Sequence, residues 1–341
     1  MRGVLLWLAL MWIGPYASAF AQSPLEEAVT LARQKRFGEA SKLIEGIKEP
    51  APLDQRIAFH RLKAAIASGL GENLAAAQEM RSALALAPTD PNLLLATALA
   101  ESQAGFVDDA LRHTEQAGKA ATEQFRIDLT FEWIKHQNFR PAIDLLEKSA
   151  QLFPRSAKLR TLLGIADYAE GEIKDAEAAF EDAIHANPRL ESPYRCMAEI
   201  VLQSSVAPSK SVTESLCAWN DIVCSALKLR EARENGDAAA EQNAIIGLKR
   251  ASPDSVVGRC ELARAYEWTG QLNSAREQME ACVNLDPLPQ NHYRLALLYK
   301  KLGQTELARK ELELRSEILQ RMSEQTALGL SALQSFESRS K

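Results

Sequence analysis

Glycine and aromatic residues are scarce in this sequence of 341 residues. It contains 16 glycines, and phenylalanine, tryptophan and tyrosine together make up 6% of it. This scarcity argues against a β-rich fold, because strands favour aromatic and β-branched side chains. The abundant residues are alanine, leucine, glutamate, lysine and arginine, which favour helices. The composition therefore predicts an all-α protein.

The sequence also lacks a stripe of arginine or lysine interleaved with aromatic residues, and its net charge is −5. Nucleic-acid binding therefore has no support. Hydrophobic residues make up 46% of the chain and charged residues 25%. These proportions are typical of folded domains and argue against wholesale disorder.

Motifs that carry catalysis or bind metal are missing as well. The five histidines are scattered, without an H-x-x-x-H, H-x-H or C-x-x-C pattern: His60, His113, His136, His185 and His292. The sequence contains neither a phosphate-binding P-loop nor a G-x-S-x-G motif. We therefore expect no catalytic residue, cofactor or metal; an enzyme whose site is assembled from distant parts of the chain is the alternative.

The N-terminus holds the one long apolar run. Residues 3–21 carry no charge, Gly14-Pro15 interrupts them, and Ala19-Phe20-Ala21 fits a small-x-small cleavage site. We expect residues 1–21 to be a signal peptide cleaved after Ala21, which would export the chain to the periplasm or the cell exterior. The alternative is an uncleaved anchor, although nineteen residues would barely span a bilayer. No later apolar run approaches 18 residues, so we expect no membrane insertion after cleavage.

A ladder of residues repeats along the rest of the chain. From Gly171, a small, a large, a small residue and a proline follow 5, 9, 12 and 17 positions later: Ala176, Phe180, Ala183 and Pro188. The same offsets start at Gly71, at Gln137 and at Gly270, where they give Ala76, Met80, Ala83 and Pro88; Ala142, Leu146, Ser149 and Pro154; and Ala275, Met279, Cys282 and Pro287. Pro154 and Pro188 lie 34 residues apart, as do Pro253 and Pro287.

This spacing predicts pairs of helices. The glycine between them ends the first helix, and the small residues lie where the two backbones cross closely. The proline ends the second helix before the next pair begins. One such pair cannot bury its apolar face alone, so several must stack into a continuous core.

The ladder resembles the tetratricopeptide repeat, most clearly in "LLGIADYAEGEIKDAEAAFEDAIHANP" and "RCELARAYEWTGQLNSAREQMEACVNLDP". The early tryptophan of that family is replaced by Arg160 and Arg259, and its tyrosine is present as Tyr266 but replaced by Asp167. The resemblance implies a right-handed α-solenoid of stacked antiparallel helix pairs. We expect about nine pairs over residues 22–322, irregular around 204–221, followed by a capping helix and frayed tail at 323–341.

Two local features complete the expected array. Gly38 is expected as the turn glycine of the first pair, displaced by one position. Ser211 and Glu214 offer a capping box for a short helix within the irregular segment.

Members of this family usually bind protein or peptide segments in a concave groove lined by the first helix of each pair. The resemblance therefore implies two sets of groove residues here. The first set is apolar and suits a partner helix or extended segment: Leu95, Leu99, Phe131, Ile134, Ile165, Tyr168 and Leu202. The second set is polar with aromatic anchors: Arg230, Arg233, Arg264, Glu267, Trp268, Tyr293, Lys300 and Lys301. A cation of the second set would suit a partner's carboxylate.

The five cysteines allow several states. Cys282 stands at a close-packing position, where a buried thiol is expected. Cys217 and Cys224 would lie about 10 Å apart on one continuous helix, too far to bond. If a turn falls near residues 219–221, they flank it and a disulfide can form. The odd number of cysteines leaves at least one free thiol.

The functional expectation is an exported scaffold that binds a protein or peptide partner. The rival hypothesis is a structural role, in which the array docks onto itself or onto a cell-envelope complex. The sequence names neither the partner nor the oligomeric state.

Overall fold

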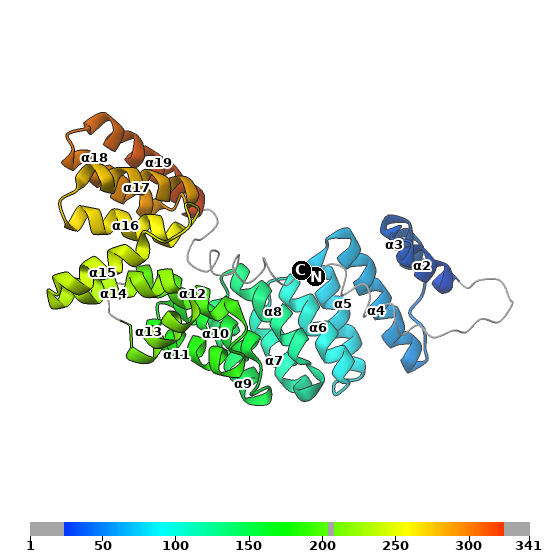
Figure 1. Ribbon diagram of the computed structural model, residues 1–341. Helices are drawn as coiled ribbons and strands as arrows, with labels where there is room; N and C mark the ends of the chain where they lie inside the picture. Colours follow the sequence, from blue (N-terminus) through cyan, green and yellow to red (C-terminus); the bar gives the residue numbers. More distant parts are fainter. Residues whose placement is uncertain (1–23, 204–207, 324–341) are drawn as a thin grey trace. The chain divides into compact units, whose positions relative to one another are not determined.

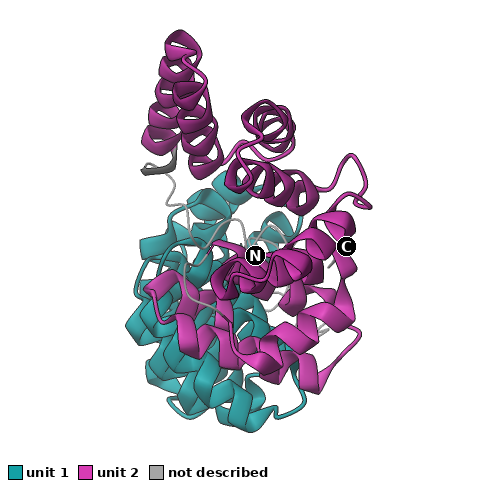
Figure 2. Cartoon of the chain, turned by 60° about the vertical axis from the view of Figure 1, so that its left-hand side comes forward, with its two compact units in different colours: residues 1–163 teal, residues 164–341 magenta. Residues whose placement is uncertain are grey.

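The computed structural model describes residues 24–203 and 208–323. The expected signal peptide at 1–21 and the tail at 324–341 lie outside the described residues. Within them the chain forms helices and turns, with no strand (Figure 1). It divides into two compact units, residues 1–163 and 164–341, shown in two colours in Figure 2. The all-α prediction is confirmed for the described part of the chain.

The first unit is a row of helical hairpins. Its helices are α2 (Pro24–Arg33), α3 (Phe37–Glu45), α4 (Leu53–Leu70), α5 (Asn73–Leu86), α6 (Pro91–Gln103), α7 (Val107–Ala117), the 3-10 turn η1 (Gly118–Ala120), α8 (Glu123–Lys135) and α9 (Phe139–Leu152). The helices form four pairs, α2 with α3, α4 with α5, α6 with α7 and α8 with α9, and the two helices of each pair pack against each other. Successive pairs also pack together, α3 on α4 and α5 on α6. The boundary between the units falls within α10 (Ala157–Glu170).

The second unit continues the same plan. Its helices are α11 (Ile173–Ala186), α12 (Glu191–Gln203), α13 (Lys210–Trp219), α14 (Asp221–Asn235), α15 (Ala238–Leu248), α16 (Val256–Trp268), α17 (Leu272–Leu285), α18 (Pro289–Lys301) and α19 (Thr305–Ser323). The pairs α14–α15, α16–α17 and α18–α19 form hairpins that pack in succession (Figure 1). We call the first helix of a hairpin helix A and the second helix B.

A left-handed residue separates helix A from helix B in eight hairpins of the described chain. At Gly171, where φ is +89°, the Gly171 N–H donates to the Tyr168 carbonyl and the Glu172 N–H to the Asp167 carbonyl. This pattern satisfies the last carbonyls of helix A. Equivalent turns lie at Lys35, Gly71, Gly105, Gln137, Gly236, Gly270 and Gly303.

The repeating ladder forms the seam between helices A and B. Its small and large members are buried, none of them more than 2% exposed: Ala76, Met80, Ala83, Ala142, Leu146, Ser149, Ala176, Phe180, Ala183, Ala275, Met279 and Cys282. Gly164 shows why small residues are needed opposite them. A Cβ added to Gly164 would lie 2.8 Å from the Phe180 ring. The predicted close crossing of the two helices is confirmed.

Two predicted details are wrong. The first hairpin turns at Lys35, whose φ is +60°, whereas Gly38 lies inside α3. The prediction chose Gly38 because glycine readily adopts left-handed backbone, whereas a lysine such as Lys35 rarely does. In the irregular segment, the residue that caps α13 is Ser209, whose hydroxyl accepts a hydrogen bond from the Val212 N–H; Ser211 is already helical.

Candidate functional site

The predicted apolar groove residues divide into two groups. Leu99, Ile134 and Ile165 are 3%, 1% and 0% exposed, so they belong to the core and offer no surface to a partner. Helical periodicity placed them on helix A, but it does not separate the open face from the seam with the next hairpin. The others are partly buried and keep some accessible surface: Leu95, Phe131, Tyr168 and Leu202.

The second set is organised around a carboxylate that the prediction missed. Glu261 on α16 is 3% exposed. The Arg230 guanidinium on α14 donates to its Oε1 at 2.9 Å, and Arg264, one turn along α16, lies 3.2 Å from its Oε2. Arg230 also donates to the carbonyls of Val201 and Leu202 at the end of α12, where a cation is favourable. These contacts hold the two guanidinium groups in place.

Arg294 on α18 is a third cation of this group. It interacts with Glu261, Arg230 and Glu267 through charge, and its pKa is lowered by burial. In the part of the chain that the structure describes, it forms neither a hydrogen bond nor an ion pair. We call Arg230, Arg264 and Arg294, together with Glu261, the arginine cluster.

The arginine cluster holds more positive than negative charge. Burial lowers the pKa of Arg264 to about 10; Glu261 opposes the fall, and Arg230 and Arg294 add to it. The nearby Glu267 carboxylate is engaged by Lys301, whose Nζ lies 2.5 Å from its Oε1. Three partly buried guanidinium groups thus interact through charge with one buried carboxylate, and two of them contact it. An incoming anion would relieve their mutual repulsion.

Two aromatic side chains on the same helices contact other arginines. Arg233 lies over the Trp268 ring, 5.4 Å from its centroid, and forms a 3.5 Å ion pair with Glu241. Tyr293 is exposed and carries Arg315 over its ring at 5.1 Å. Lys300 is exposed on α18. The second predicted set therefore gathers on α14, α16 and α18, the helices A of three successive hairpins.

The last two hairpins, which carry Glu261, Arg264 and Arg294, match a family model. Residues 258–287 and 289–314 match the model of the tetratricopeptide repeat. The chain therefore contains tetratricopeptide repeats. The matched segments cover most of α16, all of α17 and α18 and the first half of α19, and with them Arg264, Glu261 and Arg294. The tetratricopeptide fold accounts for the all-α chain of stacked hairpins.

For three solved structures similar to this chain, we give the sequence identity, the TM-score and the share of each chain that is covered. A tetratricopeptide repeat protein from Parabacteroides merdae has 15% identity and a TM-score of 0.39, with 86% of this chain and 97% of that one covered. The Cut9–Hcn1 hetero-tetramer of the APC/C has 13% identity and a TM-score of 0.43, with 95% of this chain and 65% of that one covered. The pilF protein of Pseudomonas aeruginosa has 16% identity and a TM-score of 0.33, with 64% of this chain and 99% of that one covered. No curated protein sequence matches the chain.

Two members of the cluster, Glu261 and Arg294, were not predicted. Both stand nine residues before the turn glycine of their tetratricopeptide hairpins, Gly270 and Gly303. Leucine occupies that position in three other hairpins, as Leu62, Leu162 and Leu227. In the hairpins that turn at Lys35 and Gln137 this position is also charged, as Glu26 and Asp128, so a charge there did not single out Glu261 and Arg294 in the sequence.

The cysteines form two disulfides. Cys217 and Cys224 are joined across the turn at Asn220, with their Cα atoms 4.3 Å apart. Cys260 on α16 is joined to Cys282 on α17. The expectation that Cys282 is a simple buried thiol is therefore wrong, because the ladder of small residues does not reveal that α16 brings Cys260 beside it. Cys196 takes part in neither disulfide and is buried, which raises the pKa of its thiol to about 12.

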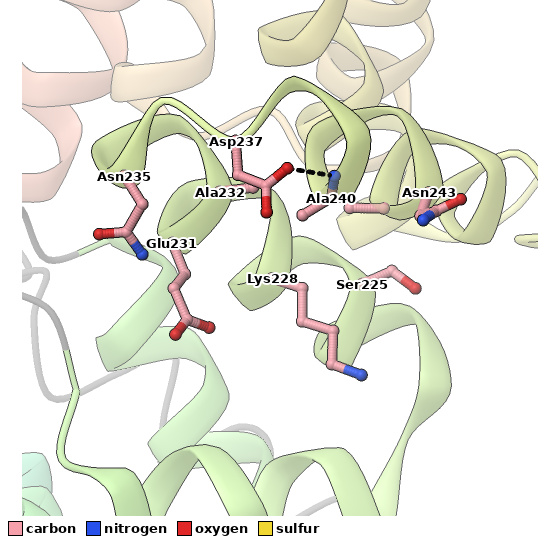
Figure 3. A pocket seen from close by; sticks show the side chains of 9 residues that line it. Ser225, Lys228, Glu231, Ala232, Asn235, Asp237, Ala240 and Asn243 are labelled. Atoms are coloured by element: carbon pink, nitrogen blue, oxygen red, sulfur yellow. Dashed lines mark hydrogen bonds between the residues drawn. The ribbon is translucent and has the colours of Figure 1, made fainter.

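A polar cavity of about 530 Å³ lies between α14 and α15 (Figure 3). Ser225, Lys228, Glu231 and Asn235 line it from α14, with Asp237 and Asn243 on the facing side. The Asp237 carboxylate accepts a hydrogen bond from the Ala240 N–H and so caps α15. Because Arg230 is not among its lining residues, this cavity is separate from the arginine cluster.

Two further searches cover the described ranges, 24–203 and 208–323. They contain no group of three or more histidine, cysteine, aspartate or glutamate side chains placed to hold a metal ion. No helix there has the length and apolar character needed to cross a membrane.

Proposed function

We propose that this protein is an exported scaffold that binds a protein partner, and that the partner places a carboxylate on the arginine cluster. Tetratricopeptide repeats are protein-interaction modules, which supports the scaffold role. The observation that carries the proposal is the imbalance of charge around Glu261, a buried carboxylate that contacts Arg230 and Arg264 and interacts through charge with Arg294.

Arg294 is the residue best placed to take the partner's carboxylate. Arg230 and Arg264 already contact Glu261, whereas the guanidinium of Arg294 makes no such contact within the described chain. A guanidinium binds a carboxylate through two parallel hydrogen bonds, and these are stronger than bonds between neutral groups. Trp268 and Tyr293 would add aromatic surface beside the bound segment.

Two features support export. The N-terminal segment has the pattern of a signal peptide cleaved after Ala21. Disulfides such as Cys217–Cys224 and Cys260–Cys282 persist in oxidising compartments and are rare in the cytosol. We therefore assign the mature chain to the periplasm or the cell exterior.

The test begins with affinity capture from a cell-envelope extract on the immobilised mature chain, followed by titration calorimetry with each captured protein. Arg294→Gln is expected to weaken binding about tenfold, which corresponds to one charge-assisted contact. Added salt should weaken the wild type more than the variant, because an ionic contact is screened.

Lys174→Gln is the matched control, since Lys174 is exposed on α11 and carries the same charge. It should leave the affinity unchanged. If Arg294→Gln bound every captured protein as tightly as the wild type, the arginine cluster would not be the binding site.

A further inference from the structure

The last helix of the described chain, α19, carries apolar side chains on its outward face. Leu307 and Leu314 are each 41% exposed, and Ile318 follows one turn later and is partly buried. These three residues lie at helical spacing along one side of α19. We call them the α19 stripe.

Comparison with the other hairpins shows that the α19 stripe is exceptional. Leu314 stands eleven residues after the turn residue Gly303. In the other hairpins the residue at this offset is polar or small: Ser82, Gln116, Lys148, Asp182, Gly247 and Ala281. Leu307, four residues after the turn, replaces Ala75, Asp109, Pro141, Asp175, Ala240 and Ser274. Large apolar residues at these two solvent-facing positions leave apolar surface on one side of α19 that a partner could cover.

Charges beside the stripe indicate its occupant. Lys310 and Glu317 are exposed and lie on one flank of the stripe, seven residues apart. To the extent that the chain is described, neither side chain has an ionic partner. Other charges on α19 are engaged: Arg309 with Glu306 and Glu313, and Glu311 with His292.

We propose that the α19 stripe pairs with the α19 stripe of a second copy of this chain, in antiparallel orientation. A two-fold axis near the middle of α19 places Leu307 against Ile318 of the second copy. It also places Lys310 against Glu317 of the second copy, and two-fold symmetry makes each contact twice. A parallel pairing would set Lys310 near the second copy's Arg315, which repels it. The charges thus favour the antiparallel arrangement.

The association is concentration-dependent, because a stripe of three side chains is smaller than the interface of a stable dimer. This surface lies on a helix B of the last hairpin and involves no residue of the arginine cluster. The proposed pairing and the proposed binding of a partner's carboxylate can therefore be tested separately.

Sedimentation velocity of the mature chain tests the proposal. Over a roughly hundredfold range of concentration, the wild type should shift from monomer to dimer by mass action. Leu307→Glu with Leu314→Glu should keep the chain monomeric throughout. Leu285→Glu is the matched control, because Leu285 is 39% exposed on α17, and it should dimerise like the wild type.

Charge reversal tests the orientation. Lys310→Glu alone and Glu317→Lys alone should each weaken the dimer about tenfold, because like charges then face each other. The double variant Lys310→Glu with Glu317→Lys should restore it. Circular dichroism of each variant checks that the helices remain folded.

A wild type that stays monomeric at every concentration would overturn the proposal and leave the stripe to the tail at 324–341 or to another protein. Dimerisation that survives the leucine substitutions would overturn it equally. Failure of the double charge reversal to restore the dimer would exclude the antiparallel pairing.

Discussion

Cys260 of α16 is bonded to Cys282 of α17, with their Cα atoms 5.1 Å apart, and Glu261 of the arginine cluster is the next residue. The disulfide therefore fixes the helix that holds the buried carboxylate against its partner helix. Cys282 stands at the ladder position that other hairpins fill with Ala83 and Ala183. The crosslink is thus added to packing that alanine already satisfies.

Removing this crosslink should destabilise the second unit. Cys260→Ala with Cys282→Ala is expected to lower the free energy of unfolding by about 3 kcal/mol, because the unfolded chain regains the freedom of a loop of this length. Cys217→Ala with Cys224→Ala, which closes a shorter loop, should cost about 2 kcal/mol. Urea denaturation of both variants measures the difference. Equal losses would contradict the loop-length argument.

Replacing Arg264 should stabilise the free protein while weakening partner binding. Burial and the neighbouring arginines lower the pKa of Arg264 to about 10, so its charge is less favourable in the folded state than in the unfolded state. Arg264→Met removes that charge and leaves Arg230 on Glu261. We expect a gain of about 1 kcal/mol at neutral pH.

The gain should shrink as the pH rises through the folded pKa of Arg264. From that pH up to the ordinary, higher pKa of arginine, the cost of the buried charge falls progressively, because the folded protein releases the proton before the unfolded chain does. Thermal unfolding of both proteins between pH 8 and pH 11 checks this trend. A variant less stable than the wild type at neutral pH would show that the Arg264–Glu261 pair is net stabilising.

Cys196 should be the one thiol that reacts, and only after unfolding. Burial raises its thiol pKa to about 12, so at pH 8 about one molecule in ten thousand carries the reactive thiolate. Iodoacetamide should leave the native, unreduced protein unmodified and add a single group in denaturant. Mass spectrometry counts the adducts. Three or five adducts without reductant would mean that one or both disulfides are absent.

Gly164 and Gly38 should respond in opposite ways to alanine. At Gly164 the new Cβ would lie 2.8 Å from the Phe180 ring and 3.0 Å from the Ala176 carbonyl oxygen. Gly164→Ala should therefore destabilise the protein by about 1–3 kcal/mol. At Gly38, inside α3, nothing lies within 4 Å of the new Cβ, and Gly38→Ala should stabilise by about 0.5–1 kcal/mol. Thermal unfolding of the two variants measures both changes.

The hairpins could be predicted from the sequence because their physical requirements repeat. A close crossing needs a small residue on each helix, and a sharp turn needs left-handed backbone, so Ala176, Ala183 and Gly171 recur at fixed spacing. In the first hairpin, where Lys35 meets the requirement against its own preference, the prediction moved to the wrong position, Gly38.

The candidate site was predicted less completely. The position of Arg230 and Arg264 within their repeats placed them on the helices A, and the structure brings both onto Glu261. Their shared carboxylate was missed because a buried Glu261 becomes recognisable only when three helices are seen side by side. Leu99 and Ile165 were misplaced for the converse reason, since an apolar helix face reads the same whether it faces a groove or another hairpin.

The two turns without glycine bear on how the array opens. Lys35 and Gln137 hold left-handed backbone at a cost of about 1 kcal/mol each, which glycine would avoid. Because each hairpin of a solenoid contacts only its neighbours, such a cost is felt locally and is not shared by the whole chain. Backbone amides beside residues 35 and 137 should therefore exchange with deuterium sooner than those beside Gly71 or Gly105, and unzipping of the array should start at these two hairpins.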